Sequence, residues 1–285
     1  MAELLGVRFL ATEYSTGKTH AGRIDSLGID EDNSPVIVEY KRSTGENVIN
    51  QGLFYLNWLM DHKAEFELLV LKRFGGSVAD LIDWSAPRLI CIAGDFTRYD
   101  SHAVEQMDRN IELVRYRQFG DELLLFELVN SPTYNASRSG QRAGKTSSHQ
   151  MPGDNKDAMD VRVSTSKDRT YAEWQTLLSP EMKSLLDSAE EYIISLGDDV
   201  QRKELKLYVA FKRLKNFASI VPQKAKLLLF LSLNPDLVQP LPPNARDGRL
   251  FGHWGTGDLE LSIVSIPDFE ASKPLIALAY EGLSR

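Results

Sequence analysis

A strand-like run at positions 36–41, VIVEYK, carries two residues whose chemistry is unusual in an apolar segment. Side chains alternate between the two faces of a strand, so Ile37, Glu39 and Lys41 share one face. A lone charge in a dry interior is costly, whereas a carboxylate beside an ammonium group at the edge of a cleft is tolerated. The spacing therefore predicts a polar cleft beside this strand.

Asp25 lies in the preceding strand-like run, GRIDSLGI at 22–29. Its side chain shares the face of Glu39 if paired positions of the two antiparallel strands sum to an even number, such as 64 or 66. Two carboxylates that converge form a site for a hard divalent cation, typically Mg²⁺. Such an ion lowers the pKa of a bound water, and Lys41 would stabilise developing negative charge. These parts suit hydrolysis of a phosphodiester bond.

A helix is predicted over 47–63, NVINQGLFYLNWLMDHK, from its apolar stripe at helical spacing. Gln51 and Tyr55 are four residues apart on this helix, so both can project from one face. We expect this face to point toward the cleft of Asp25 and Glu39.

The segments GRID at 22–25, VIVEYK at 36–41 and QGLFY at 51–55 resemble, in this order, the Asp, Glu-x-Lys and Gln-x-x-x-Tyr elements of the PD-(D/E)xK nuclease superfamily. Within it, the nuclease domain of the NucS-type mismatch endonucleases is the most similar, over residues 4–95. The resemblance implies a restriction-endonuclease-like mixed core sheet flanked by helices. It also implies a site whose predicted residues are the metal ligands Asp25, Glu39 and the backbone carbonyl of Val38, the catalytic cation Lys41, and Gln51 lining the site. The implied metal is Mg²⁺ or Mn²⁺.

Members of this superfamily usually carry a further acid on a helix before the first strand. Glu3 and Glu13 are the candidates for this additional ligand. Arg23 and Arg42 flank the motifs where DNA phosphates would approach, and Tyr55 is a further predicted nucleic-acid contact.

The charge of the chain is unevenly distributed. Residues 1–130 hold 13 Lys and Arg against 21 Asp and Glu, a net charge of −8, within a total of −7. Three of these acids, Asp30, Glu31 and Asp32, form a turn that we expect to be solvated. A polyanionic partner would therefore have to be held by local basic patches.

One such patch spans 202–226, with eight Lys and Arg against Glu204 alone and aromatic residues among them. One interpretation is nucleic-acid binding, with Lys212, Arg213 and Lys215 as contacts. The other is that the aromatic side chains pack inward while the lysines keep sheet edges soluble. The sequence favours neither.

Composition divides the chain. Residues 131–168 are rich in Ser, Gly, Asn and basic residues and lack hydrophobic periodicity, which predicts a flexible linker between domains at 1–130 and 169–285. Mixed strands and helices predict an α/β (α+β) fold for the first domain. The second is expected to be a small α+β domain with an antiparallel sheet, and it resembles the domain of unknown function DUF5655.

No apolar run approaches the ~20 residues that a membrane helix needs, so we expect no membrane association. The single Cys91 excludes an intramolecular disulfide, which fits a reducing cytoplasm. The function that these features favour is a Mg²⁺-dependent DNA endonuclease with a C-terminal accessory domain, acting as a homodimer if it cuts both strands. The alternative is a catalytically inactive nuclease fold that binds nucleic acid or has a regulatory role.

Overall fold

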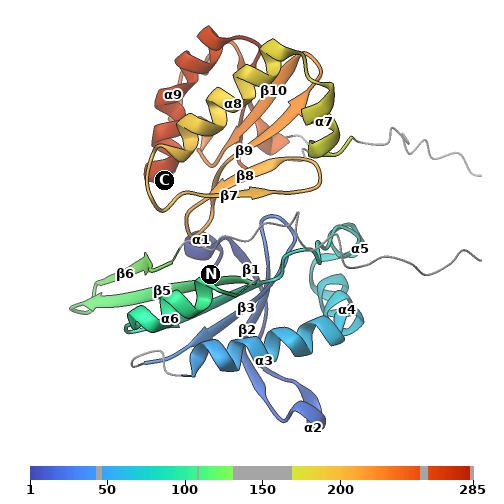
Figure 1. The fold of residues 1–285 in the computed structure, drawn as a ribbon, viewed down its shortest axis with the longest axis vertical. Helices are drawn as coiled ribbons and strands as arrows, with labels where there is room; N and C mark the ends of the chain where they lie inside the picture. Colours follow the sequence, from blue (N-terminus) through green and yellow to red (C-terminus); the bar gives the residue numbers. More distant parts are fainter. Residues whose placement is uncertain (43–46, 108, 131–168, 251–255, 283–285) are drawn as a thin grey trace, which may run out of the picture.

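The computed structural model describes residues 1–42, 47–107, 109–130, 169–250 and 256–282, and the predicted linker at 131–168 lies outside them. The strands form two separate six-stranded sheets, one from the N-terminal part of the chain and one from the C-terminal part (Figure 1). The fold is therefore mixed α/β with a second, antiparallel sheet, as predicted.

The N-terminal sheet has the order β1-β2-β3-β4-β5-β6 and is mixed, because β3, β4 and β5 run parallel while the other pairs are antiparallel. Its strands are β1 (Val7–Ser15), β2 (Arg23–Asp30), β3 (Pro35–Tyr40), β4 (Arg88–Ala93), β5 (Asn110–Phe119) and β6 (Leu123–Leu128). Its helices are α1 (Ala2–Leu5), α2 (Gly17–His20), α3 (Val48–Asp61), α4 (Lys63–Phe74), α5 (Gly76–Ala79) and α6 (Arg98–Glu105).

The two faces of this sheet bury separate apolar clusters. On one face, Ile37 and Leu89 pack with Leu59 of α3 and Phe66 of α4. On the other face, Val36, Val38, Ile90 and Ile92 are covered by Leu5 of α1 and by Leu214 from the C-terminal part. Glu39 shares its face with Ile37 by alternation, so it lies on the side of α3.

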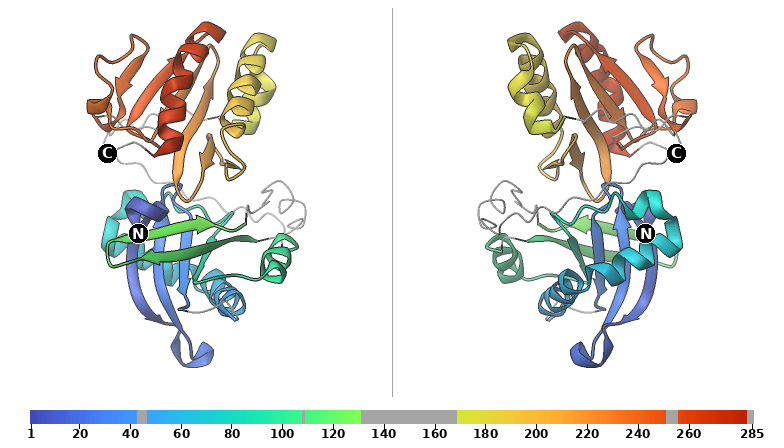
Figure 2. Two further views of the ribbon diagram at one scale, coloured as in Figure 1. Left: turned by 90° about the vertical axis from the view of Figure 1, so that its left-hand side faces the viewer. Right: turned by 90° about the vertical axis from the view of Figure 1, so that its right-hand side faces the viewer.

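The C-terminal sheet is antiparallel throughout, in the order β11-β12-β10-β9-β8-β7. Helices α8 and α9 lie against one face of it (Figure 2) and bury residues such as Leu186 and Ile276 there. Its strands are β7 (Gln201–Glu204), β8 (Val209–Lys212), β9 (Asn216–Gln223), β10 (Lys226–Leu231), β11 (Ala245–Asp247) and β12 (Leu259–Ile263). Its helical segments are α7 (Tyr171–Leu177), α8 (Pro180–Ile194), η2 (Pro235–Leu237), η3 (Gly248–Leu250) and α9 (Ile266–Glu281).

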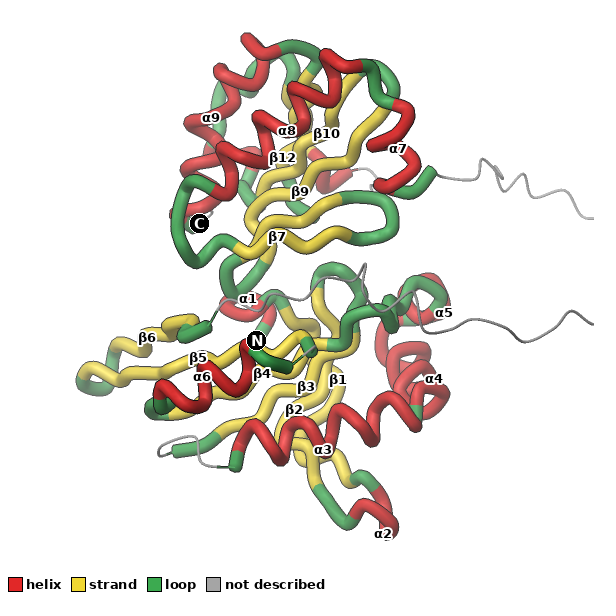
Figure 3. Tube along the Cα trace, viewed as in Figure 1, coloured by secondary structure: helices red, strands yellow, loops and turns green. Residues whose placement is uncertain are grey.

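The two parts meet at an edge of the C-terminal sheet. Its edge strand β7 lies next to one end of the N-terminal sheet (Figure 3). Contacts between the parts join the turn after β2 and Arg88 of β4 to Lys203 of β7 and to the segment where β8 leads into β9. None of the described helices is both long and apolar enough to cross a membrane.

Candidate metal-binding site

The two predicted acidic ligands face each other where β2 and β3 separate. The pairing of Ser26 with Val38 gives a register sum of 64, an even number, so continuing it by one residue places Asp25 opposite Glu39. Each carboxylate binds the backbone of the other strand. Tyr40 N donates to Asp25 Oδ2 over 2.9 Å, and Asp25 N donates to Glu39 Oε1 over 3.1 Å. These two hydrogen bonds fix both side chains at the fork of the strands.

Glu39 is fully buried, and its second carboxylate oxygen, Oε2, has no hydrogen-bond partner among the described residues. Burial, together with the charge of Asp25, raises the pKa of Glu39 to about 8, although the N–H of Asp25 and the charge of Lys41 act in the opposite direction. A carboxylate held in this way gains from a nearby cation. The donor set, two carboxylates at an open strand end, fits a hard divalent ion such as Mg²⁺ or Mn²⁺.

Lys41 follows the last residue of β3, and its N–H donates to Ile92 O over 2.8 Å, which holds it beside the end of β4. Its side chain is partly exposed, and its charge acts on the carboxyl group of Glu39. The backbone of Val38 pairs with Ser26 on one side and Ile90 on the other. Its carbonyl oxygen remains a predicted ligand.

The hydroxyl group of Tyr55, on α3, connects this helix to the start of β2. Tyr55 OH accepts a hydrogen bond from Gln51 Nε2 over 3.2 Å and another from Arg23 N over 3.1 Å. Because the Tyr55 side chain is only 5% exposed, it cannot offer its ring to a nucleic acid, and that prediction was wrong. Tyr55 instead ties α3 to the start of β2, two residues before Asp25.

The candidates for a further ligand do not join the pair. Glu13 Oε2 lies 2.6 Å from Arg23 Nη1, so this carboxylate is already paired with a cation. Glu3 lies on α1, which is followed by β1. The first residue of β1, Val7, pairs with Asp30, at the end of β2 that is far from Asp25. Within the described ranges, no group of three or more His, Cys, Asp and Glu side chains is placed to hold a metal ion. Arg23 and Arg42 are exposed near the fork, as a phosphate contact requires.

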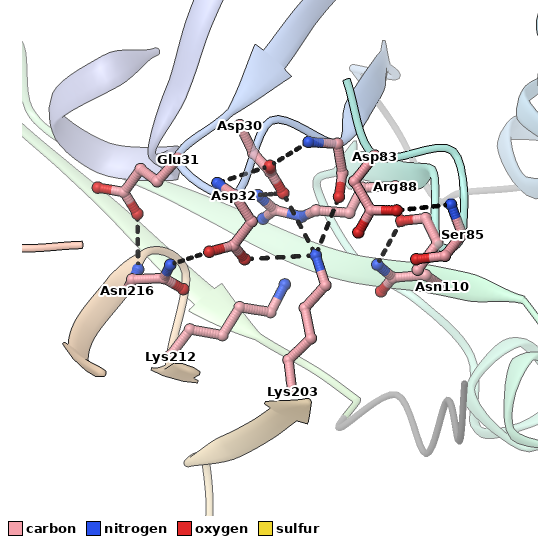
Figure 4. A network of polar contacts seen from close by, with 12 residues as sticks. Asp30, Glu31, Asp32, Asp83, Ser85, Arg88, Asn110, Lys203, Lys212 and Asn216 are labelled. Atoms are coloured by element: carbon pink, nitrogen blue, oxygen red, sulfur yellow. Dashed lines mark hydrogen bonds and ion pairs between the residues drawn. The ribbon is translucent and has the colours of Figure 1, made fainter. Parts of the chain in front are cut away.

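A second polar cluster lies at the opposite end of the same sheet, where the two parts meet (Figure 4). Arg88 binds Glu112 in a bidentate manner, with both N–O distances 2.9 Å, and also contacts Asp30 Oδ2 at 3.3 Å. From the C-terminal part, Lys212 Nζ lies 2.5 Å from Glu112 Oε1, and Lys203 Nζ lies 3.3 Å from Asp32 Oδ2. We call this set the interface cluster.

Neutral groups complete the interface cluster. Asp32 Oδ1 accepts from Tyr208 OH at 2.9 Å and from Asn216 Nδ2 at 2.7 Å, while Asn216 N donates to Glu31 Oε2 at 2.8 Å. Burial raises the pKa of Glu112, but the charges of Arg88 and Lys212 outweigh it and bring the pKa to about 2. The acid is therefore ionised and paired at neutral pH.

The interface cluster corrects two expectations. The turn at Asp30, Glu31 and Asp32 is not solvated, because Asp30 and Asp32 are at most 5% exposed. Lys212 is only 4% exposed and paired with Glu112, so it cannot contact a nucleic acid.

The two other predicted contacts of the basic stretch also lie beside acids. Arg213 Nε lies 2.5 Å from Asp199 Oδ2, and Lys215 acts on the partly buried carboxyl group of Glu31. Several of the basic side chains at 202–226 therefore serve as partners for acids of the same chain. The uneven charge of the sequence, −8 before residue 131 against a basic stretch at 202–226, is the feature that could have indicated ion pairs between the two parts of the chain.

Comparison with known proteins finds similarities to one family, one relative and one solved structure. Residues 173–281 match the family described as "Domain of unknown function (DUF5655)", as the sequence predicted. An uncharacterized protein of Haemophilus influenzae is 27% identical over 284 residues, which cover 97% of this chain and 87% of that protein. A crystal structure of a repair endonuclease from Pyrococcus abyssi shares 18% identity with a TM-score of 0.24, over 39% of each chain. A similarity of that size does not assign a function, and the PD-(D/E)xK assignment stays a prediction.

Proposed function

We propose that the N-terminal part is a metal-dependent endonuclease that hydrolyses phosphodiester bonds in DNA, with Asp25 and Glu39 as the residues that hold Mg²⁺ or Mn²⁺. The observation that supports this proposal is the convergence of two carboxylates from β2 and β3, one of them buried with an oxygen atom that lacks a protein partner among the described residues. An unpaired buried carboxylate oxygen is costly, and a bound cation removes that cost. The PD-(D/E)xK assignment belongs to the same proposal.

The metal ion, when bound, would supply Lewis acidity and a more acidic water. The protein's own groups do the rest. The backbone N–H groups of Asp25 and Tyr40 hold the two carboxylates in place, and Lys41 stabilises negative charge that develops on the phosphoryl group. Gln51 and Tyr55 fix the start of β2, and the exposed Arg42 would attract DNA phosphates.

Calorimetric titration with Mn²⁺ tests the ligands directly. We expect the wild-type protein to bind Mn²⁺, and we expect Asp25→Asn and Glu39→Gln to lose this binding together with cleavage of DNA. The control Asp121→Asn removes an exposed carboxylate from the turn between β5 and β6 and leaves both unchanged. Equal Mn²⁺ affinity in all four proteins would remove Asp25 and Glu39 as ligands.

The role of Lys41 is separable from metal binding. We expect Lys41→Met to retain Mn²⁺ binding while losing about 100-fold or more in cleavage rate, since one electrostatic stabiliser of a transition state contributes on that order. Lys72→Met, at an exposed position of α4, is the matched control. Cleavage by the Lys41 variant at the wild-type rate contradicts the assignment.

A second function, a nuclease-like part that binds nucleic acid or a regulatory partner without cutting, is favoured by a specific observation. Among the described residues only two acids converge at the fork, and both already accept hydrogen bonds from the backbone. This alternative predicts no Mn²⁺ binding that depends on Glu39, together with unchanged retention of DNA on substitution of Asp25. The C-terminal DUF5655 part would serve either function as an accessory that is fixed to the N-terminal part, in the cytoplasm, where Cys91 stays reduced.

A further inference from the structure

The strand β6 forms an exposed edge of the N-terminal sheet. Three consecutive leucines of this strand, Leu123, Leu124 and Leu125, are 67%, 56% and 47% exposed, and Phe119, which pairs with Leu123, is 53% exposed. The β5–β6 hairpin extends sideways beyond the rest of the N-terminal part (Figure 1). No other described strand pairs with the outer edge of β6. A row of backbone hydrogen-bonding groups is therefore flanked by apolar side chains on both faces.

The opposite edge of the same sheet, β1, is protected in several ways. A bulge between Phe9 and Ala11 breaks its register, and α4 lies over it, with Tyr14 OH donating to Glu65 and the Arg8 guanidinium 5.3 Å from the centre of the Phe74 ring. Bulges, charges and covering elements are the usual means of preventing strand addition. The sequence of β6, LLLFEL, has a regular register and a single charge. Of the two edge strands that the structure describes in this sheet, β6 is thus the one open to pairing.

The occupant of this edge must be a strand with apolar side chains on both faces. Residues 131–168, which follow β6 in sequence, contain no two consecutive large apolar residues, so they do not match this requirement. A second β6 does. In an antiparallel pair centred on Leu125, Leu124 of each copy lies opposite Phe126 of the other, and Glu127 lies opposite Leu123, so no two carboxylates oppose each other.

We propose that β6 is a dimerisation strand, through which two copies of this chain join their N-terminal sheets edge to edge about a two-fold axis. The pairing gives the open backbone groups of β6 partners and brings the exposed leucines of the two copies into cross-strand contact on both faces. It does not depend on the proposed nuclease activity, because none of the residues of the candidate metal-binding site belongs to β6.

Light scattering coupled to size-exclusion chromatography tests the proposal. We expect the wild-type protein to have twice the mass of one chain. Leu125→Lys should be monomeric, because it brings two ammonium groups together at the centre of the pair. It should remain folded with only a small loss of stability, since Leu125 is half exposed and the new charge stands opposite Arg117 of the same chain. Leu237→Lys makes the same change at a 56% exposed position of η2 and should leave the dimer intact.

Hydrogen exchange of the β6 amides in the wild-type protein gives a test that needs no variant. Protection of residues 123–128 should increase with protein concentration, because pairing covers the outer amides only in the dimer. A dimer that persists in Leu125→Lys overturns the proposal. So does a wild-type protein that stays monomeric at every concentration, whether β6 exchanges freely or is protected by another segment of its own chain.

Discussion

Glu39 and Glu13, two carboxylates near the end of β2 that holds Asp25, differ in burial and in their partners. Glu39 is enclosed and has one oxygen without a partner in the described part of the chain, whereas Glu13, in the neighbouring part of β1, is half exposed and paired with Arg23. Alternation along β3 was sufficient to predict the face of Glu39. It could not predict that the Tyr55 ring would be buried, because helical spacing gives the direction of a side chain and not what covers it.

The position of Glu31 in the turn after β2 changes the pKa of its carboxyl group. Burial at the junction raises the pKa of Glu31 from 4.5 to about 7, opposed by the hydrogen bond from Asn216 N. The charged groups around it are Arg8, Asp30, Asp32 and Lys215. The folded protein keeps a proton that the unfolded chain releases. The contribution of Glu31 to stability is therefore present below about pH 4.5 and decreases as the pH rises toward 7.

We predict that Glu31→Gln reduces the loss of stability between pH 5 and pH 8. The Gln side chain can still accept from Asn216 N but carries no charge at either pH. Urea unfolding at both values measures the difference, and the contribution of Glu39, whose pKa is also raised, is common to both proteins and cancels. Glu105→Gln, at an exposed site on α6, is the control. The same pH dependence in wild type and Glu31→Gln would show that Glu31 does not titrate in this range.

At the scale of elements, the pairing of β1 with β2 depends on a close approach at Gly28. A Cβ atom at this position would lie 2.4 Å from Val7 Cγ1 and 2.8 Å from the carbonyl oxygen of Arg8, and the latter is backbone that cannot move independently. We predict that Gly28→Ala lowers the free energy of unfolding by roughly 1–3 kcal/mol.

Chemical denaturation measures this change, with Gly76→Ala as the matched control, because the nearest atom to a Cβ there is Leu71 Cδ1 at 3.8 Å. Equal stability of the Gly28 and Gly76 variants would mean that β1 shifts to accommodate the methyl group. That shift would also move the edge strand beside Asp25.

The elements near the candidate site were largely predictable. The runs at 22–29 and 36–41 and the helix over 47–63 correspond to β2, β3 and α3, because each has a clear period and a turn or cap at its end. The run at 204–211, ELKLYVAF, reads as one strand but contains a tight turn, in which Leu205 N donates to Tyr208 O over 2.8 Å. Leu205 and Tyr208, at the two ends of that turn, are buried in the same apolar cluster, so alternation alone could not reveal the turn.

At the scale of the whole molecule, the interface cluster joins acids of one part to bases of the other. We predict that Lys212→Ala lowers the free energy of unfolding by roughly 1–3 kcal/mol, since it removes a buried hydrogen bond to a charged group while Arg88 stays paired with Glu112. Lys226→Ala, on β10 of the same sheet and only partly buried, should change it by less than about 0.5 kcal/mol. Denaturant unfolding followed by fluorescence measures both.

DNA-binding measurements on Lys212→Ala and Lys226→Ala distinguish Lys212 as an ion-pair partner of Glu112 from Lys212 as a contact for DNA. If the basic stretch at 202–226 held DNA, Lys212→Ala would weaken DNA binding while leaving stability unchanged. The sequence could not decide this point, because a pattern of charges shows that partners are needed but not whether they come from the same chain. Only the folded chain brings Lys212 to Glu112 across 100 positions of sequence.

The candidate metal-binding site and the junction with the C-terminal part lie at opposite ends of β2, at Asp25 and Asp30. Five residues of extended chain separate these ends by about 17 Å at ~3.4 Å per residue. That length matches about five base pairs of B-form duplex. If DNA binds at the carboxylates as proposed and runs along β2, a fragment shorter than this ends before the C-terminal part, and only a longer one contacts both parts of the chain.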